Sequence, residues 1–170
     1  MRLARYRPIW SLLMTQHVLS PIDRAILECL QADPRISMAA LAEKTHSSVS
    51  PCWRRVKRLE EIGVIDGYNL LLNRKALGLG IEAFVFVKID SHHERDAVEF
   101  EHALEVIDEV LSCYILSGQE DYLLRVVATD LDAFADFSRK RLAALPHVRE
   151  VRSAFVMHTI KESHRLPLPQ

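Results

Sequence analysis

The residues best suited to chemistry in this sequence form a short basic run. Four of the five residues from Arg54 to Arg58 are basic, and no acidic residue follows until Glu60. Solvent-facing helix surfaces usually mix both signs of charge, because opposite charges three or four residues apart attract one another. An unbalanced run is typical of a surface that meets a polyanion, with guanidinium groups binding phosphates or guanine edges. The alternative interpretation is an ordinary solvated face, and the position of the run within the fold must decide.

The charge of the whole chain is distributed unevenly. The 170 residues carry a net charge of −1, but residues 1–75 hold 12 Lys and Arg against 7 Asp and Glu. The remaining residues hold 10 against 16, so the first part carries +5 and the second −6. A basic part joined to an acidic part favours a nucleic-acid partner for the first, with random surface charge as the alternative.

The basic run lies on one side of a predicted helix that begins after Ser48 and ends near Ile62, before Gly63. At about 100° per residue, the apolar side chains of Cys52, Val56 and Leu59 share a sector, and that of Trp53 lies beside it. The opposite sector is polar and basic. We expect DNA to be contacted by this face and by the entering end of the helix, which together comprise Ser48, Ser50, Pro51, Arg54, Arg55, Lys57 and Arg58.

Two shorter helices must position this one. Ser20 and Asp23 predict a capping box at the start of the first, which Asp33-Pro34 ends. A second helix is predicted from Met38 to Lys44, and the polar turn Thr45–Ser47 joins it to the basic helix. Two helices joined by a three-residue turn form a helix-turn-helix, whose second helix enters the major groove. This position favours DNA binding over a solvated face.

A wing and a linker are predicted to follow. Asp66-Gly67 is a favoured two-residue turn between short apolar segments, so Val64–Leu70 predicts a hairpin and the motif is a winged helix-turn-helix. The sequence Leu77–Gly80 predicts a flexible crossing to a second domain. The predicted divisions are residues 1–18 as an N-terminal extension, 19–75 as the DNA-binding domain, 76–80 as the linker, and 81–170 as an effector-binding and oligomerisation domain.

The second domain predicts an α+β fold with the order βαββαβ, the split arrangement of ferredoxin-like domains. Its helices then cover only one face of an antiparallel sheet. The first strand, Ile81–Asp90, has apolar residues on both sides, with Phe84 and Phe86 on the side opposite Val85 and Val87. An uncovered apolar face predicts self-association, and a homodimer would present two recognition helices to DNA. The predicted elements after the first strand are helix 94–111, strands 113–117 and 122–129, helix 130–145 and strand 148–161.

Other chemistries find little support in the residues. The three cysteines are too widely spaced for a disulfide framework or a zinc module, which favours a reducing cytoplasm. His92, His93 and His102 could approach one metal, but no recognised ligand spacing accompanies them. Phosphate-binding glycine loops and nucleophile motifs are absent from the sequence, and no apolar run approaches the roughly 20 residues that cross a bilayer. We therefore expect no cofactor, no enzymatic activity and no membrane partner.

Several segments, in the same order, resemble the Lrp/AsnC family of bacterial and archaeal transcription regulators. The resemblance covers nearly everything from Leu19 to Leu168. The segments that carry it are Leu19–Leu27, Ser50–Glu60, Gly63–Tyr68, Gly118–Leu124, Ile160–Ser163 and Leu166–Leu168.

This resemblance implies a winged helix-turn-helix followed by a regulatory domain that dimerises, often assembles into octamers, and binds a small effector, commonly an amino acid. The effector would lie between regulatory domains near one turn, where Asp121 would bind an ammonium group and the backbone around Gly118 a carboxylate. The alternative is that these two residues only shape a hairpin turn. The implied effector residues are Ser117, Gly118, Asp121 and Tyr122.

The sequence also resembles one branch of the family more specifically, and two alternative functions stay open. Pro51-Cys52-Trp53, Leu77–Gly80 and His92-His93 are similar to a branch of the family that senses cysteine, whereas Val49 stands where many members have proline. Sirohaem decarboxylases resemble the same plan, but a tetrapyrrole enzyme has little use for a basic recognition helix. A ligand-binding oligomer without DNA function is another alternative. We expect a cytoplasmic, effector-responsive regulator that binds double-stranded DNA.

Overall fold

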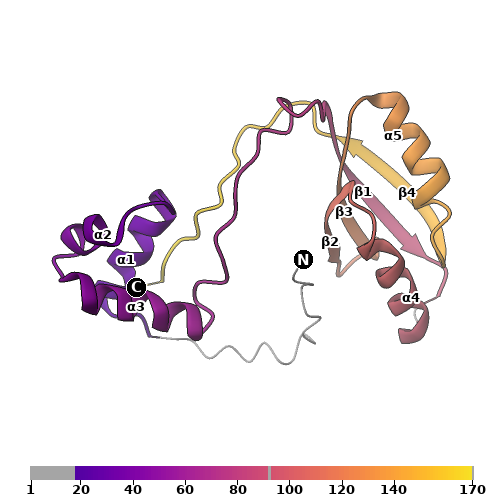
Figure 1. The fold of residues 1–170 in the computed structure, drawn as a ribbon. Coiled ribbons are helices and arrows are strands. Elements are labelled where there is room, and N and C mark those ends of the chain that lie inside the picture. The colour runs from indigo at the N-terminus through magenta and orange to yellow at the C-terminus, as the bar shows by residue number, and fades with distance from the viewer. Residues whose placement is uncertain (1–17, 92, 170) are drawn as a thin grey trace. The chain divides into compact units, whose positions relative to one another are not determined.

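The computed structural model describes residues 18–169 except His92, so all of the predicted N-terminal extension but Val18 lies outside the described residues. The chain divides into two compact units (Figure 1). The described part of the first unit comprises residues 18–70 and 162–169, and the second unit comprises residues 71–161. The sequence predicted 81–170 as a single domain, but its last residues join the first unit. Among the described residues, no helix is long and apolar enough to cross a membrane.

The first unit contains three helices, α1 (Pro21–Ala32), α2 (Met38–Lys44) and α3 (Val49–Glu61). The predicted capping box is confirmed, because the Ser20 side chain accepts from the Asp23 amide and the Asp23 carboxylate accepts from the Ser20 amide. The predicted apolar stripe of α3 is also confirmed. The buried residues between the helices are Ile26, Leu27, Leu41, Ala42, Cys52, Val56 and Leu59.

The predicted end of α3 near Ile62 is confirmed, but the segment that follows it differs from the prediction. Gly63 has a φ of +74°, and the amides of Val64 and Ile65 both donate to the Leu59 carbonyl at 3.0 Å. These bonds close the helix in the left-handed conformation that glycine adopts most readily. The hairpin predicted for Val64–Leu70 is wrong, because this described segment forms no strand pairing and continues as an irregular chain.

The predicted linker, residues 76–80, lies in a hydrogen-bonded segment. The Leu79 amide donates to the Arg74 carbonyl at 2.9 Å, while the Arg74 guanidinium donates back to the Leu79 carbonyl at 2.8 Å. The Gly80 amide donates to the Thr129 carbonyl at 3.1 Å, and a Cβ on Gly80 would lie 2.8 Å from that oxygen. Residues 73–80 are therefore a bonded turn attached to the second unit.

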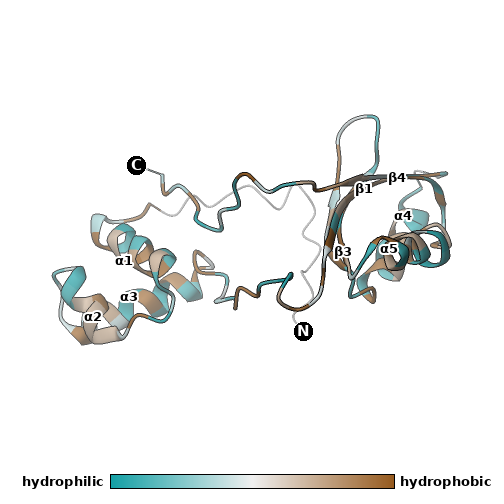
Figure 2. Ribbon diagram, turned by 90° about the horizontal axis from the view of Figure 1, so that it is seen from above, coloured by the Kyte–Doolittle hydropathy of each residue, from teal (hydrophilic) through white to brown (hydrophobic). Residues whose placement is uncertain are grey.

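The second unit is an antiparallel four-stranded sheet with helices on one face (Figure 2). Its strand order is β2-β3-β1-β4, which confirms the ferredoxin-like prediction. The elements in chain order are β1 (Ile81–Ile89), α4 (Glu94–Glu105), β2 (Val110–Ile115), β3 (Tyr122–Ala128), α5 (Leu131–Phe137), a π-helical turn η2 (Ser138–Leu142) and β4 (Val148–Phe155).

Two boundaries needed the tertiary structure. Val110 and Leu111 begin β2 instead of ending the helix, because α4 stops at Glu105 and Val110 pairs with Val126 of β3. Strand β4 ends at Phe155, although apolar residues continue along the chain. The Val156 amide still donates to the Glu82 carbonyl at 2.9 Å, and β1 begins only one residue before Glu82, so the pairing ends there.

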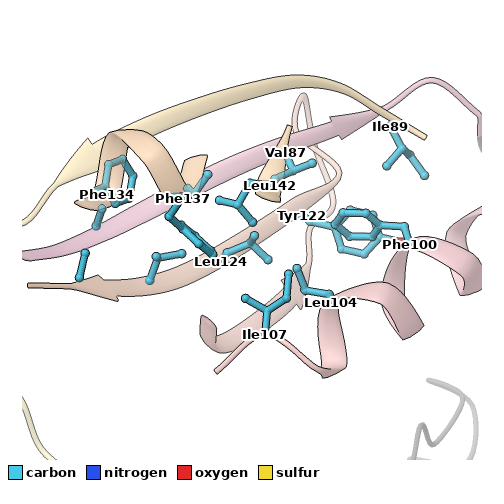
Figure 3. Packing of buried hydrophobic residues seen from close by; sticks show 14 residues of the cluster. Val87, Ile89, Phe100, Leu104, Ile107, Tyr122, Leu124, Phe134, Phe137 and Leu142 are labelled. Atoms are coloured by element: carbon cyan, nitrogen blue, oxygen red, sulfur yellow. The ribbon is translucent and has the colours of Figure 1, made fainter. Parts of the chain in front are cut away.

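The core of the second unit lies between the sheet and its helices (Figure 3). Alternate residues of β1, namely Ala83, Val85, Val87 and Ile89, are buried there, as the sequence predicted. The helices contribute Phe100, Leu104, Phe134, Phe137 and Leu142 to the same core.

The opposite face of the sheet has no helix over it (Figure 2). Phe84 is 37% exposed there, and the Arg152 guanidinium lies 4.4 Å from the centre of the Phe86 ring. Glu82 is buried on the same side, with Arg125 Nε at 2.5 Å and Arg74 Nε at 3.1 Å. This face therefore combines aromatic side chains with paired charges.

Candidate nucleic-acid interface and effector site

Helix α3 presents one side to its neighbours and one to solvent. The side chains of Cys52, Val56 and Leu59 fill the core, which fixes the rotation of the helix about its axis. The residues expected to contact DNA that are exposed are Ser48, Ser50, Arg54, Lys57 and Arg58, while Pro51 and Arg55 are partly buried. Trp53 is a correction, since its place beside the apolar sector predicted burial, whereas it is 50% exposed.

The basic residues of α3 do not share one environment. Arg55 Nη1 lies 2.9 Å from Asp23 Oδ1 and donates to the Ser20 hydroxyl at 3.3 Å, so its guanidinium faces α1. Arg58 Nη1 lies 3.6 Å from Asp23 Oδ2. Arg54 has no ion-pair partner among the described residues and stands free on the outer side. The sequence predicted one uniform basic face, and the structure corrects this. Arg55 lies at the edge of that face, and its ion pair with Asp23 connects α3 to α1.

Asp23 is the acidic centre of this arrangement. Its side chain is only 2% exposed, and burial by itself would raise its pKa. Hydrogen bonds from Ser20 and Arg55 outweigh that effect, so the pKa of Asp23 lies below its ordinary value. A carboxylate that stays ionised while buried can hold both the start of α1 and the side of α3.

Lys57 belongs to a second, exposed group. Its Nζ lies 2.8 Å from Glu60 Oε2, and the Tyr68 hydroxyl donates to Glu60 Oε1 at 3.2 Å. The hydrogen bond from Lys57 to the Glu60 carboxylate raises the pKa of Lys57 and lowers the pKa of Glu60. Sequence reasoning missed Tyr68, because an isolated tyrosine in a loop carries no periodic pattern. Lys57 is still half-exposed, so it can turn towards an incoming phosphate.

The turn between β2 and β3 contains the expected effector residues. Ser117 and Gly118 are exposed, whereas Asp121 is partly buried. The Asp121 amide donates to the Val87 carbonyl at 3.1 Å, and Asp121 Oδ2 accepts from the Ile89 amide at 2.9 Å. Asp121 therefore braces the turn against the end of β1, and the turn brings it near Ser117 and Gly118.

Tyr122 is a correction to the expected effector site. It is 3% exposed, its ring centre lies 4.7 Å from that of Phe100, and its hydroxyl donates to Glu101 Oε1 at 3.0 Å. Burial and the Glu101 carboxylate raise the pKa of this phenol. As the first residue of β3, Tyr122 points to the helix-covered side of the sheet (Figure 3). Its side chain therefore packs in the core and does not face the exposed turn.

Glu120 is a neighbour of the turn that the sequence did not single out. It is an acceptor for Arg152 Nη2 at 2.9 Å and lies 3.7 Å from Lys88 Nζ. Its partners come from β1 and β4, both far away in sequence, so no local pattern indicates the pairing. The Arg152 guanidinium and the Lys88 ammonium beside this turn are therefore already paired with the Glu120 carboxylate.

The part of the chain that the structure describes offers no candidate metal site. That part holds no group of three or more His, Cys, Asp or Glu arranged to bind a metal ion. Of the histidines considered for a metal, His93 and His102 belong to α4 and its cap, and His92 lies outside the described residues. Cys52 is fully buried in the core of the first unit, as its place in the apolar sector predicted.

Comparisons with known proteins agree with this division. Residues 19–66 match the model described as winged helix-turn-helix DNA-binding, and residues 82–166 match the Lrp/AsnC ligand binding domain. The DNA-binding transcriptional activator DecR of Escherichia coli K12 is 36% identical over 151 residues, which cover 89% of this chain and 99% of the relative.

Two solved structures are similar as well. A transcriptional regulator of Neisseria meningitidis in complex with L-Met superimposes with a TM-score of 0.84 and 36% identity, over 88% of this chain and 96% of that one. The feast or famine regulatory protein of M. tuberculosis complexed with L-methionine has a TM-score of 0.79 and 34% identity, over 87% and 97%.

Proposed function

The chain belongs to the Lrp/AsnC family of transcription regulators, and on this premise we propose that it binds specific double-stranded DNA as a homodimer or larger assembly under control of an amino acid. The family relatives are regulators and not enzymes, so the tetrapyrrole-enzyme alternative is set aside. The observation that carries the DNA-binding assignment is the outer side of α3, which is basic and exposed.

Within that helix, the residues divide by role. Arg54 and Lys57 are proposed as the main contacts to phosphates or base edges, because both side chains are exposed and Arg54 is unpaired among the described residues. Arg58 is proposed to reach a phosphate while remaining near Asp23. Arg55 is proposed to orient the helix through Asp23, with only its outer edge near DNA. Ser48, Ser50 and Pro51 are proposed to enter the groove first.

The salt dependence of DNA binding tests this assignment. If a dimer contacts about 6 phosphates, the logarithm of the affinity for its own promoter region should fall with the logarithm of salt at a slope of about −5. Arg54→Ala removes one contact per protomer, so the slope should become less negative by about 2. Glu43→Ala on α2 is a control that removes an exposed charge outside the proposed interface. A slope near zero for the parent protein would contradict the assignment.

The dimer is proposed to form through the sheet face that carries Phe84 and Phe86. Support comes from the partial exposure of both rings on a face without a covering helix. A two-fold pair would present two copies of α3 to successive turns of the DNA. Assembly beyond the dimer, up to an octamer, is the expectation from the family.

The effector is proposed to be an amino acid that binds at the turn holding Ser117, Gly118 and Asp121. Support comes from the two similar structures in complex with methionine and from the carboxylate of Asp121 beside exposed backbone. Titration calorimetry with the twenty L-amino acids, methionine and cysteine included, tests the class, with D-methionine as a control for stereochemistry. Binding of no L-amino acid, or equal binding of both methionine enantiomers, would reject it.

A further inference from the structure

The C-terminal segment makes a specific contact with helix α1. The Gln31 side-chain amide donates to the Leu166 carbonyl at 3.2 Å, and its oxygen accepts from the Leu166 amide at 2.6 Å. Arg165 Nε donates to the Gln31 carbonyl at 3.3 Å. The Gln31 amide group therefore pairs with the tail backbone much as one strand pairs with another.

The next apolar side chain of the tail completes the packing. Leu168 is partly buried and packs against the core cluster of the first unit, whereas the Leu166 side chain is 75% exposed. The tail thus uses the backbone of one leucine and the side chain of the other.

The sequence of this segment suits docking at low entropic cost. Pro167 and Pro169 alternate with the two leucines, and each proline restricts its own φ and the conformation of the residue before it. An already extended segment loses less conformational freedom when it is ordered. Proline also has no amide hydrogen, so Pro167 adds no unpaired donor after Leu166, while the Arg165 amide before it donates to the Ser163 hydroxyl at 3.2 Å.

We propose that residues 162–169 are a functional part of the DNA-binding domain. Their docking on α1 positions the helices of this domain for binding to DNA. The chain leaves the first unit after Leu70 and re-enters it at Glu162, so two peptide connections join the units instead of one. A second connection removes orientational freedom before DNA binds, which lowers the entropy lost on binding. This proposal rests on the proposed function of DNA binding.

The test compares two substitutions of the same kind in the full-length protein. Leu168→Asp places a charge against the apolar cluster, whereas Leu166→Asp changes an exposed side chain and keeps the backbone bonds to Gln31. For Leu168→Asp we expect faster hydrogen exchange in α1, melting of the first unit lower by about 4–8 °C, and promoter DNA affinity reduced about tenfold. Leu166→Asp should stay within about twofold of the parent affinity, and both variants should keep the parent's assembly size.

A milder variant keeps the test interpretable if Leu168→Asp unfolds the domain. Gln31→Ala removes both side-chain bonds to Leu166 and leaves the core intact, so exchange in α1 should quicken and DNA affinity fall by about two- to fivefold. Parent-like exchange and DNA affinity in Gln31→Ala and Leu168→Asp would overturn the proposal. A smaller assembly with unchanged exchange in α1 would also overturn it, since the tail would then serve assembly.

Failure of the proposed function gives a different result. If the parent protein itself does not bind promoter DNA, the regulator assignment fails, while exchange in α1 still reports whether the tail docks. Docking without an effect on the DNA affinity of an active parent would refute only the positioning role.

Discussion

The ion pair between α1 and α3 yields the sharpest prediction. Asp23→Asn keeps the shape of the side chain but removes its charge and one acceptor. The carboxylate it replaces accepts hydrogen bonds from the amide and hydroxyl of Ser20 and from Arg55. We expect the first unit to lose stability while its fold is kept.

The magnitude follows from the parts that are lost. A helix cap contributes about 1 kcal/mol, and a hydrogen bond to a charged group about 1.5–3 kcal/mol. Breaking a fully buried pair costs about 3–5 kcal/mol, but the Arg55 side chain is 36% exposed and regains water when its partner is neutralised. The expected loss of unfolding free energy is therefore about 2–3 kcal/mol.

Native-state hydrogen exchange is the suitable assay, because two units in one chain make a single unfolding curve hard to assign. Exchange of amides in α1, α2 and α3 isolates the first unit. The pKa of Asp23 is depressed in the folded protein, so its stabilisation is present above the unfolded pKa. It is lost as pH falls through the folded pKa, and Asp23→Asn should lack this part of the acid destabilisation.

Two adjacent arginines supply the control. Arg55→Ala should destabilise the first unit because it leaves Asp23 with a weaker partner, whereas Arg54→Ala should change stability little and DNA binding more. Equal losses of stability in the two variants would refute the reasoning. So would a loss below about 0.5 kcal/mol in Asp23→Asn, the range of ordinary surface substitutions.

Three further predictions concern the second unit. Phe86→Asp should reduce the assembly to monomers in size-exclusion chromatography with light scattering, because it places a charge on the proposed dimer face; an unchanged mass would argue against that face. Gly80→Ala should destabilise the unit by about 1–3 kcal/mol, since its Cβ would meet the Thr129 carbonyl at 2.8 Å, and thermal unfolding checks this. Tyr122→Phe should cost about 1 kcal/mol through the bond to Glu101 and leave effector affinity unchanged by calorimetry; a large loss of affinity would return Tyr122 to the effector site.

Much of the fold was predictable from the sequence because its determinants are local. The helix beginning at Ser20 and the buried residues of α3 follow from side chains a few positions apart, whose spacing matches one turn of helix. The alternation along β1 likewise separates a buried face from an open one. The order of these elements then restricted the second unit to a ferredoxin-like arrangement, and the basic run indicated the helix that we propose to contact DNA.

What only the tertiary structure decided depends on residues far apart in the chain. Arg55 forms an ion pair with Asp23 on another helix, and Tyr122 packs against Phe100 of α4. Leu168 packs against core residues that lie more than a hundred positions earlier in the chain. A sequence pattern reports which side of an element is apolar, but hydrogen bonds and ion pairs also need a partner at the right distance and angle. Such partners exist only once the chain has folded, so the sequence determined the faces of this protein and the structure determined what each face contacts.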